Sequence, residues 1–515
     1  MTSAIVHVVT SHRRVTPSIL SALALTFAFA VPAVGAPGDT TQVSLKGDSG
    51  GLYRNAMSAD GRYVVYYDGD DRVMVRDRQS GTLRRVDVTP TGAPAECCES
   101  RPTASISSSG RYVVFTSESS NLVQGDTNDR ADVFVRDLQL NSTERVSVTT
   151  TGAQLADGSG DAAISGDGRY VAFSLSQTRG TVYVRDRQLG TTRMVASRGS
   201  SLSLSDSGRF LAFISDAALV PDDSNGKPDA YVWDRATGIV ERMSVSSDGV
   251  QANGASYLAT ISPDGHYVAF YSDASNLVAI DENKAKDVFL RDRWSGRTER
   301  IWTKTKQAVS GPPALSADGR FVAFFTCASL FHGDQNRDGN FYVRDRATGA
   351  TEVVSITTEG LFGWVTGDHP PAISADGSVV ALRYWFPPRE SFRDRIVYTH
   401  EAGGAGPLAT PFTLLPRVLA LGDQAVGTTR TLYFRLRNTG SAPLEVQSIL
   451  PYKGDSSQFT VGSASSCGTL PPDAVCRIPV TFRPTSTGLK KWTISVEAGN
   501  RVVRLRKVTG TGVSP

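Results

Sequence analysis

The stretch Ser316-Ala-Asp-Gly-Arg-Phe-Val-Ala-Phe324 decides the fold, because six other stretches of the chain repeat its pattern. These stretches are residues 58–66, 107–115, 165–173, 205–213, 262–270 and 374–382. The glycines of the seven copies are 40 to 58 residues apart, which is the period of a four-stranded propeller blade with loops of variable length. The chain is therefore expected to be built from seven similar units.

Each unit divides into the same four predicted strands. The first strand ends at the Ser-x-Asp-Gly turn, and the second is the apolar run that follows it. A third strand reads like Val-Tyr-Val-Arg-Asp-Arg at 182–187, and a fourth like Thr-Glu-Arg-Val-Ser-Val at 143–148. Polar and apolar residues alternate with a period of two throughout, which indicates an all-β protein.

The seventh unit lacks its fourth strand, and a matching piece stands at the other end of the repeats. Residues 41–45, Thr-Gln-Val-Ser-Leu, are like the fourth strands and precede the first unit. If this segment completes the seventh unit, the ring has no open interface between its first and last blades. We predict an all-β chain: a seven-bladed β-propeller closed by an N-terminal strand, followed by an immunoglobulin-like β-sandwich.

The repeated phrase resembles the WD-like propeller repeat of the TolB family over about residues 40–400. The resemblance implies an exported propeller that binds other envelope proteins. We expect the propeller to span residues 40–402 and a linker to span residues 403–410.

The pattern changes to short alternating strands in the last hundred residues, 411–515, which predicts a compact sandwich. Arg437-Asn-Thr-Gly-Ser-Ala-Pro-Leu444, Val480-Thr-Phe-Arg-Pro484 and the closing Thr-Gly-Thr-Gly resemble the immunoglobulin-like domains of the ASPM, SPD-2 and hydin type. That resemblance implies interaction or spacing. Cys467 and Cys476 stand close together here, and we predict a disulfide between them. The other cysteines are Cys97, Cys98 and Cys327, so one thiol is left over whichever pair forms.

The first residues differ from the rest of the chain. Two arginines, a short apolar run and small residues predict a signal peptide over residues 1–36, and hence export to the periplasm, the cell surface or the medium. No other stretch is apolar and long enough to cross a bilayer. The 54 Lys and Arg residues nearly balance the 51 Asp and Glu residues and are interleaved with them, so no nucleic-acid partner is indicated. We expect a monomer.

Four predicted loops between second and third strands carry Asp and Asn at alternate positions. Such oxygens can ligate calcium, but the same side chains also stabilise turns by bonding their own backbone, and no loop ends in the Glu of the twelve-residue calcium loop. Both interpretations stay open, and no other cofactor is indicated. The candidate ligands are Asp126, Asn128, Asp132, Asp223, Asn225, Asp229, Asp281, Asn283, Asp287, Asp334, Asn336 and Asp338.

Two motifs that look catalytic or functional have plainer explanations. The Gly-Asp-Ser-Gly-Gly run at 47–51 matches serine hydrolase phrases, but it lacks an upstream barrel and a following helix, so we interpret it as a turn. The recurring Arg-Asp-Arg at the end of third strands is interpreted as a device that fixes turns. The repeats also place no isolated histidine, tyrosine or carboxylate in the channel, so no catalytic residue is predicted.

Variable loops on a rigid scaffold usually carry binding, and here they share one face. That face is expected to hold His332, Phe362, Trp364 and His369. Aromatic rings beside polar loops suit a glycan or a peptide, and covering of a blade edge by Trp364 is an equal alternative. The leading hypothesis is therefore an exported, non-catalytic binding or scaffold protein. An enzyme acting on glycans or peptides and a structural surface adhesin are the alternatives.

Overall fold

The structure is a computed structural model, and it describes most of the chain outside the N-terminal region. The described residues are 40–44, 51–96, 103–176, 180–281, 283, 285–301, 309–327, 339–356, 369–384, 396–402, 412–416, 418–438, 443–471, 474–498 and 502–514. The predicted signal peptide, the Gly-Asp-Ser-Gly run and the predicted linker lie outside these ranges. Nearly every described element is a β-strand, as the alternating pattern predicts.

Six four-stranded antiparallel sheets follow one another along the chain, each with its strands in sequence order. We number them as blades 1 to 6. Their strands are β2 (Gly51–Met57), β3 (Tyr63–Tyr67), β4 (Val73–Asp77) and β5 (Leu83–Arg85); β6 (Ala104–Ile106), β7 (Tyr112–Ser117), β8 (Asp132–Asp137) and β9 (Ser142–Arg145); β10 (Ser159–Ile164), β11 (Tyr170–Leu175), β12 (Val182–Asp186) and β13 (Thr191–Ala196); β14 (Ser200–Leu204), β15 (Phe210–Ser215), β16 (Asp229–Asp234) and β17 (Val240–Arg242); β18 (Ser256–Ile261), β19 (Tyr267–Ser272), β20 (Asp287–Asp292) and β21 (Arg297–Arg300); β22 (Val309–Leu315), β23 (Phe321–Thr326), β24 (Asn340–Asp345) and β25 (Thr351–Val353).

The seventh blade joins the two ends of the repeat region. It consists of β26 (Ala372–Ile373), β27 (Val379–Tyr384), β28 (Ile396–Glu401) and β1 (Thr40–Gln42), in the order β1-β28-β27-β26. Thr40 pairs with His400, and the Val43 amide donates to the Val397 carbonyl at 2.8 Å. The predicted closing strand is thus confirmed, and its paired residues are 40–42 where 41–45 were expected.

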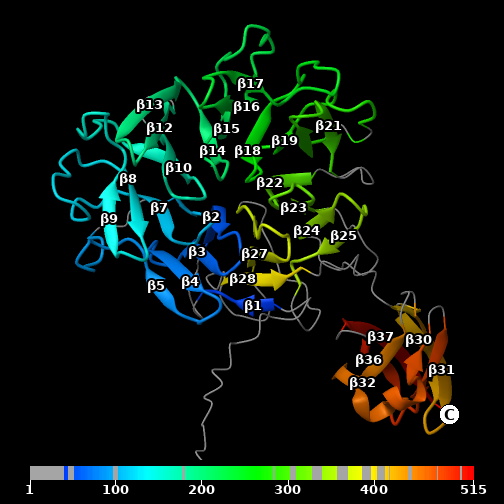
Figure 1. Cartoon of the computed structure of the whole chain (residues 1–515). Coiled ribbons are helices and arrows are strands. Elements are labelled where there is room, and N and C mark those ends of the chain that lie inside the picture. Colours follow the sequence, from blue (N-terminus) through cyan, green and yellow to red (C-terminus); the bar gives the residue numbers. More distant parts are fainter. Residues whose placement is uncertain are drawn as a thin grey trace, which may run out of the picture.

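The seven blades stand radially around a common axis, as Figure 1 shows. The innermost strand of each blade contacts the innermost strand of the next, and β2 contacts β26, so the ring is closed. Seven apolar clusters lie in this ring, most of them shared by two neighbouring blades. Second strands such as β11 are buried along their whole length because both of their faces pack against a neighbouring blade.

A belt of backbone hydrogen bonds links the blades at one end of the channel. In five blades the residue directly after the repeat's serine donates its backbone N–H to a backbone carbonyl of the next blade; these donors are Ala59, Gly166, Asp206, Ala317 and Ala375. In blade 2 the donor is Ser109, two residues after the serine. Five of these bonds are 2.8 to 3.0 Å long, and that of Ser109 is 3.3 Å. Pro263 holds the same position in blade 5 and has no N–H, so this bond cannot form toward blade 6.

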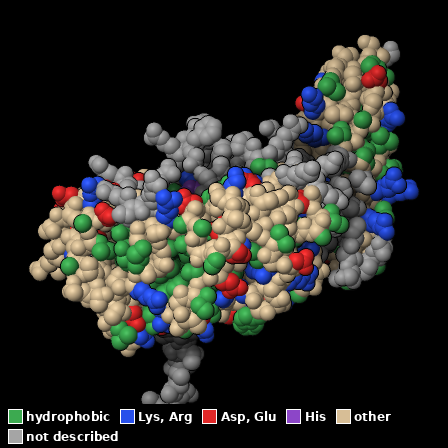
Figure 2. Space-filling view, turned by 90° about the horizontal axis from the view of Figure 1, so that it is seen from above, with side chains coloured by type: hydrophobic (Ala, Val, Ile, Leu, Met, Phe, Trp, Pro, Cys, Tyr) green, Lys and Arg blue, Asp and Glu red, His purple; other side chains and the backbone are tan. Residues whose placement is uncertain are grey.

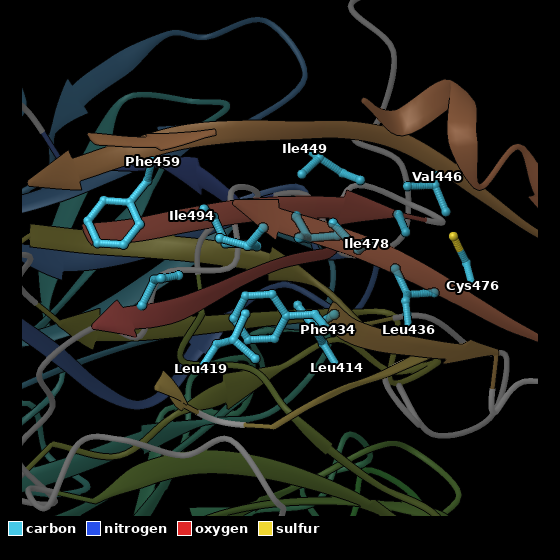
Figure 3. Close-up of a cluster of buried hydrophobic side chains, with 14 of the residues drawn as sticks. Leu414, Leu419, Phe434, Leu436, Val446, Ile449, Phe459, Cys476, Ile478 and Ile494 are labelled. Atoms are coloured by element: carbon cyan, nitrogen blue, oxygen red, sulfur yellow. The ribbon is translucent and has the colours of Figure 1, made fainter. Parts of the chain in front are cut away.

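The C-terminal residues form two packed sheets. One has the order β29 (Phe412–Leu415), β31 (Arg430–Asn438), β35 (Val475–Phe482) and β33 (Phe459–Val461). The other has the order β30 (Val418–Ala425), β37 (Val502–Val513), β36 (Gly488–Ala498), β32 (Leu444–Gly454) and β34 (Thr469–Leu470), with β30 and β37 parallel. Alternate residues of β31 and β35 point into one apolar core, which is drawn in Figure 3.

A disulfide joins Cys467 to Cys476 on β35, with the two Cα atoms 5.4 Å apart. Cys97 and Cys98 lie outside the described residues. Among the described residues, no helix is long and apolar enough to cross a membrane.

Candidate functional site

Strand order gives the propeller two unlike faces. Turns between first and second strands and between third and fourth strands lie on one face, which we call the short-turn face. Loops between second and third strands and the connections between blades lie on the other, the loop-rich face. A third strand therefore begins on the loop-rich face and ends on the short-turn face. In β8, β16 and β20 an aspartate stands at both ends.

The acidic loop of blade 2, on the loop-rich face, folds two carboxylates around one guanidinium. Arg145 Nη1 lies 3.4 Å from Asp126 Oδ1 and 3.6 Å from Asp132 Oδ2. The Gln154 side-chain amide donates to the same two oxygens at 2.7 Å each. A positively charged side chain therefore already approaches both carboxylates, where a bound cation would have to compete with it.

The acidic loop of blade 4 repeats this arrangement. The Gln251 amide donates to Asp223 at 2.7 Å and to Asp229 at 3.3 Å, and Arg242 Nη1 is 3.8 Å from Asp223. Asn225 Nδ2 donates to Asp229 at 3.0 Å. The two loops are thus held by the same kinds of partners.

In blade 5 the guanidinium of Arg300 lies closer to the two loop carboxylates than in blades 2 and 4. Arg300 Nη1 is 2.8 Å from Asp281 and 3.1 Å from Asp287, and its side chain is only 4% exposed. Asn283 Nδ2 donates to Asp287 at 3.1 Å. Arg300 follows the fourth strand's Thr-Glu pair, as Arg145 does in blade 2, so the arrangement is a property of the repeat.

The asparagines of these loops act as turn residues. Asn128, Asn225 and Asn283 each accept the backbone N–H two residues further on, at 2.7 to 3.1 Å. These are the side-chain bonds to the backbone that the structural-turn interpretation expects, and three of the four loops show them. Calcium binding stays a prediction. The fourth loop, with Asp334, Asn336 and Asp338, lies outside the described residues, and among those described no group of three His, Cys, Asp or Glu side chains could hold a metal.

Burial controls the charge of the aspartates that begin these third strands. Asp132, Asp229 and Asp287 are fully buried, and burial raises the pKa of each carboxyl above its ordinary value. Hydrogen bonds from Ser147 or Gln154, and their counterparts in the other blades, act in the opposite direction on the pKa. On this face each of the three aspartates is therefore bonded by a nearby side chain, which is Gln154, Ser244 and Asn283 in turn.

Opposite charges pair on the short-turn face as well. Arg62 Nε and Nη2 donate to the two oxygens of Asp77 at 2.9 and 2.7 Å, and the Arg209–Asp234 pair repeats this at 3.0 and 2.9 Å. In each pair the arginine lowers the pKa of the aspartate to about 2. The same aspartates accept backbone N–H groups of the following turn, for example that of Gln79 at 2.9 Å.

The last arginine of the Arg-Asp-Arg phrase fastens one blade to the preceding one. Arg346 Nη1 donates to the Gly319 carbonyl at 2.8 Å, its Nε lies 2.5 Å from Glu299 of blade 5, and its guanidinium carbon stands 4.7 Å from the ring centre of Tyr267. The turn-fixing prediction is therefore confirmed for the aspartate of the phrase, while its last arginine joins two blades. The arginines that bond their own blade's repeat glycine in this way are Arg78, Arg187, Arg235, Arg293 and Arg346.

Two aromatic clusters lie where inner strands begin on the loop-rich face. In the first, the ring centres of Tyr53 and Tyr67 are 5.1 Å apart, and those of Tyr67 and His369 are 6.0 Å apart. His369 Nδ1 is 3.2 Å from the Leu52 carbonyl, and its Nε2 is 3.4 Å from the Tyr67 hydroxyl. His369 thus joins blade 7 to blade 1 on the face where it was expected.

The second cluster is more accessible and combines rings with charge. Tyr257 and Tyr271 stack with ring centres 5.1 Å apart, and Lys286 Nζ stands 4.5 Å from the centre of the Tyr257 ring. Asp273 accepts the Tyr257 hydroxyl at 3.0 Å and lies 3.4 Å from Lys286, whose side chain is 42% exposed. Burial and the Asp273 hydrogen bond raise the pKa of Tyr257, which keeps the phenol protonated. The sequence reasoning did not single out these residues.

A cavity of about 80 Å³ lies on the axis of the propeller at the short-turn side, and residues of all seven blades line it. Each blade contributes an aliphatic residue before its repeat serine: Met57, Ile106, Ile164, Leu204, Ile261, Leu315 and Ile373. Asp206 also lines this end, and it accepts the Ser108 hydroxyl of blade 2 at 2.5 Å. The expectation of no isolated carboxylate in the channel was therefore wrong. Other copies have Ala, Ser, Gly or Pro at this position, so aligning the copies would have revealed Asp206.

Three of the four predicted binding-face residues cannot be placed. His332, Phe362 and Trp364 lie outside the described residues, and only His369 is placed. Figure 2 shows basic and acidic side chains interspersed over the described surface that it displays, in keeping with their balance in the sequence.

Comparison with known proteins adds one family match. The family described as "Abnormal spindle-like microcephaly-assoc'd, ASPM-SPD-2-Hydin" matches residues 408–506, which agrees with the resemblance in the C-terminal sheets. No curated protein matches the chain by sequence.

Several solved β-propellers are similar to the chain. TolB from Acinetobacter baumannii is 17% identical over 67% of this chain and 81% of its own, with a TM-score of 0.35. The β-propeller domain of the Trilobed protease from Pyrococcus furiosus is 12% identical over 69% and 96%, with a TM-score of 0.46. An oligogalacturonate lyase in complex with manganese is 11% identical over 72% and 99%, with a TM-score of 0.45. Such distant likenesses assign no activity to this chain.

Proposed function

We propose that the chain is an exported, non-catalytic binding protein that engages an envelope protein or a glycan with the loop-rich face of its propeller. Export rests on the predicted signal peptide. The observation that carries the binding role is the cluster of Tyr257, Tyr271, Lys286 and Asp273, which offers aromatic rings beside an exposed ion pair.

This cluster suits recognition better than proton transfer. Tyrosine rings supply apolar contact area with little conformational entropy to lose, and hydroxyl, ammonium and carboxylate groups supply directional hydrogen bonds. General acid and base catalysis instead needs groups whose pKa values lie near the working pH. Here the pKa of Tyr257 is raised, and Asp273 raises the pKa of Lys286 against the lowering effect of its burial. Both groups therefore keep their protons at neutral pH.

The test uses the mature chain with Tyr257→Ala and Tyr271→Ala combined. Wild type and variant are compared in pull-downs from envelope extracts and on a glycan array. We expect at least a tenfold loss of the bound partner, because the apolar contact and the orientation of Lys286 and Asp273 both disappear. Leu189→Ala is the matched control, since Leu189 is 67% exposed on the short-turn face.

The two arms separate the partner classes. Loss of an extracted protein identifies a protein partner, and loss of array signal identifies a glycan. Unchanged binding by the double variant, with circular dichroism showing that it is folded, would contradict the proposal. So would cleavage of a bound glycan or peptide by the wild type, which is the enzyme hypothesis.

A further inference from the structure

The junction between blades 1 and 2 lacks the arginine and glutamate pair that joins blades 2 and 3, blades 4 and 5, and blades 5 and 6. The Arg-Asp-Arg phrase of blade 2 ends in Leu138, where five blades have arginine and blade 7 has Ala402. On the facing fourth strand of blade 1, Arg84 stands where blades 2, 4, 5 and 6 have glutamate. Both members of the usual arginine and glutamate pair are therefore replaced at this junction.

Other junctions show what is missing here. At the next junction Arg187 of blade 3 reaches Glu144 of blade 2, bonds the Gly168 carbonyl and stands 4.8 Å from the centre of the Tyr112 ring. Tyr112 thus has two guanidinium neighbours, because Arg111 of its own blade is also at 4.8 Å.

The equivalent ring in blade 1 is Tyr63. Arg62 of its own blade stands 4.8 Å from its ring centre, while the neighbouring blade offers a leucine in place of an arginine. In blade 3 the Gly168 carbonyl accepts from Arg187. The equivalent carbonyl in blade 2 is that of Gly110, and the equivalent of Arg187 is Leu138, which cannot donate to it.

An open cavity of about 370 Å³ occupies this junction on the short-turn face, which is within the size range of small ligand pockets. Tyr63, Val75 and Leu138 form its apolar part, and Thr82 and Ser109 are among its polar residues. The cavity therefore lies where an arginine side chain fills other junctions.

The charges around the cavity leave one positive charge in excess. Asp77 is paired with Arg62, and Arg111 donates to Asp137 at 2.6 to 3.1 Å. Arg84 is exposed and donates to two neutral oxygens, the Leu138 carbonyl at 3.0 Å and Asn141 Oδ1 at 2.6 Å. Its charge can therefore attract an incoming carboxylate, and it repels a guanidinium.

We propose that this cavity binds an acidic peptide segment of a partner protein, with an apolar side chain packed against Tyr63, Val75 and Leu138 and a neighbouring carboxylate bound by Arg84. Leu140, which is 68% exposed on the turn beside the cavity, extends the apolar surface for the rest of the segment. This site lies on the opposite face from the proposed glycan or protein site, so either can fail without the other.

The repeat itself supplies the variant that tests the proposal. Leu138→Arg with Arg84→Glu restores the usual pair, and the new arginine is expected to fill the cavity, stack on Tyr63 and bond the Gly110 carbonyl. A random heptapeptide library displayed on phage is selected for binding to the full mature chain and, separately, to this filled variant. The enrichment of each peptide on the two proteins is then compared. Thermal melting of the variant at or above the wild-type temperature shows that loss of binding is not loss of folding.

We expect enriched peptides in which Phe, Tyr or Leu lies within two residues of Asp or Glu. The filled variant should bind a synthetic copy at least tenfold more weakly. Arg84→Gln, or replacement of the peptide's Asp by Asn, should weaken binding at least threefold. Equal enrichment on both proteins, or enrichment of basic peptides, would overturn the proposal. Competition by phenylacetate at the peptide's own concentration would also overturn it, by showing a site for small aromatic acids.

Discussion

The two ends of one strand place the same residue type in opposite environments. In β20, Asp287 begins the strand on the loop-rich face, where it is fully buried beside Arg300, and burial raises the pKa of its carboxyl. Asp292 ends the strand on the short-turn face. Its burial also acts to raise the pKa, but the backbone N–H of Ser295 and the His266 ring outweigh this and lower the pKa to about 2.

The difference lies in which groups replace the lost water. Asp292 accepts two backbone N–H groups at 3.0 Å and the His266 ring at 2.7 Å, and these favour the ionised form. Asp287 faces Asn283, Arg300 and a second carboxylate, Asp281, whose charge opposes ionisation. An aspartate in the repeat thus tightens a turn at one end of the strand and anchors a buried arginine at the other.

Asp287→Ala should give the largest effect. It removes one of two carboxylates from Arg300, whose side chain is 4% exposed, and loss of a buried partner costs about 3–5 kcal/mol of unfolding free energy. Urea denaturation followed by tryptophan fluorescence measures the change. A loss below about 1 kcal/mol would show that Asp281 alone satisfies the guanidinium.

Asp292→Ala at the other end of the same strand should cost less. It leaves the two turn N–H groups to water and frees His266, and the expected loss is about 1–2 kcal/mol. The same denaturation experiment provides the comparison. A loss as large as that of Asp287→Ala would contradict the contrast between the two ends.

Lowering the pH should change the contributions of the two aspartates to the unfolding free energy in opposite directions. Because the pKa of Asp292 in the folded chain is about 2, below the ordinary value of 3.8, its contribution is complete above pH 4 and is lost as the pH falls toward 2. Asp77 and Asp234 have pKa values of about 2 and add to this loss.

Asp292→Asn should therefore flatten the fall in stability between pH 4 and 2, by about 1 kcal/mol. Asp287 works in the reverse sense, since a raised pKa favours the folded state as the pH drops. Because this pKa lies above 3.8, the gain in stability develops above about pH 4, and Asp287→Asn should remove it there. Urea midpoints between pH 6 and 2 measure both effects, and an Asp287→Asn effect confined to the range below pH 4 would contradict these assignments.

The repeat phrase was sufficient to predict the ring, and particular residues show where prediction stopped. Val182 to Asp186 form a third strand as their alternation predicts, and the chain's early segment completes blade 7 as the missing strand required. That Arg145 enters the acidic loop could not be foreseen, because it depends on the register and twist of the fourth strand against the third. The expectation of no carboxylate in the channel failed at Asp206, since the copies were compared for what they share.

The smallest effect concerns the junction of blades 1 and 2. Leu138→Arg with Arg84→Glu should raise the unfolding free energy by about 0.5–1 kcal/mol, because it adds a stacked and hydrogen-bonded arginine that is partly exposed. Leu138→Arg alone should give less, since Arg84 then repels the new guanidinium. A double-mutant cycle measured by urea denaturation gives the coupling free energy between the two substitutions. If the double variant is less stable than the sum of the single effects predicts, the comparison with the other junctions is contradicted.

Because Pro263 has no N–H, the interface between blades 5 and 6 should be the least stable one at this end of the propeller. Where Pro263 interrupts the belt of amide hydrogen bonds, no bond of the belt joins blades 5 and 6 among the described residues. Local opening of the propeller should therefore begin at the interface of blades 5 and 6. Amide hydrogens of the strands beside this interface should exchange with solvent sooner than those at the six bonded positions.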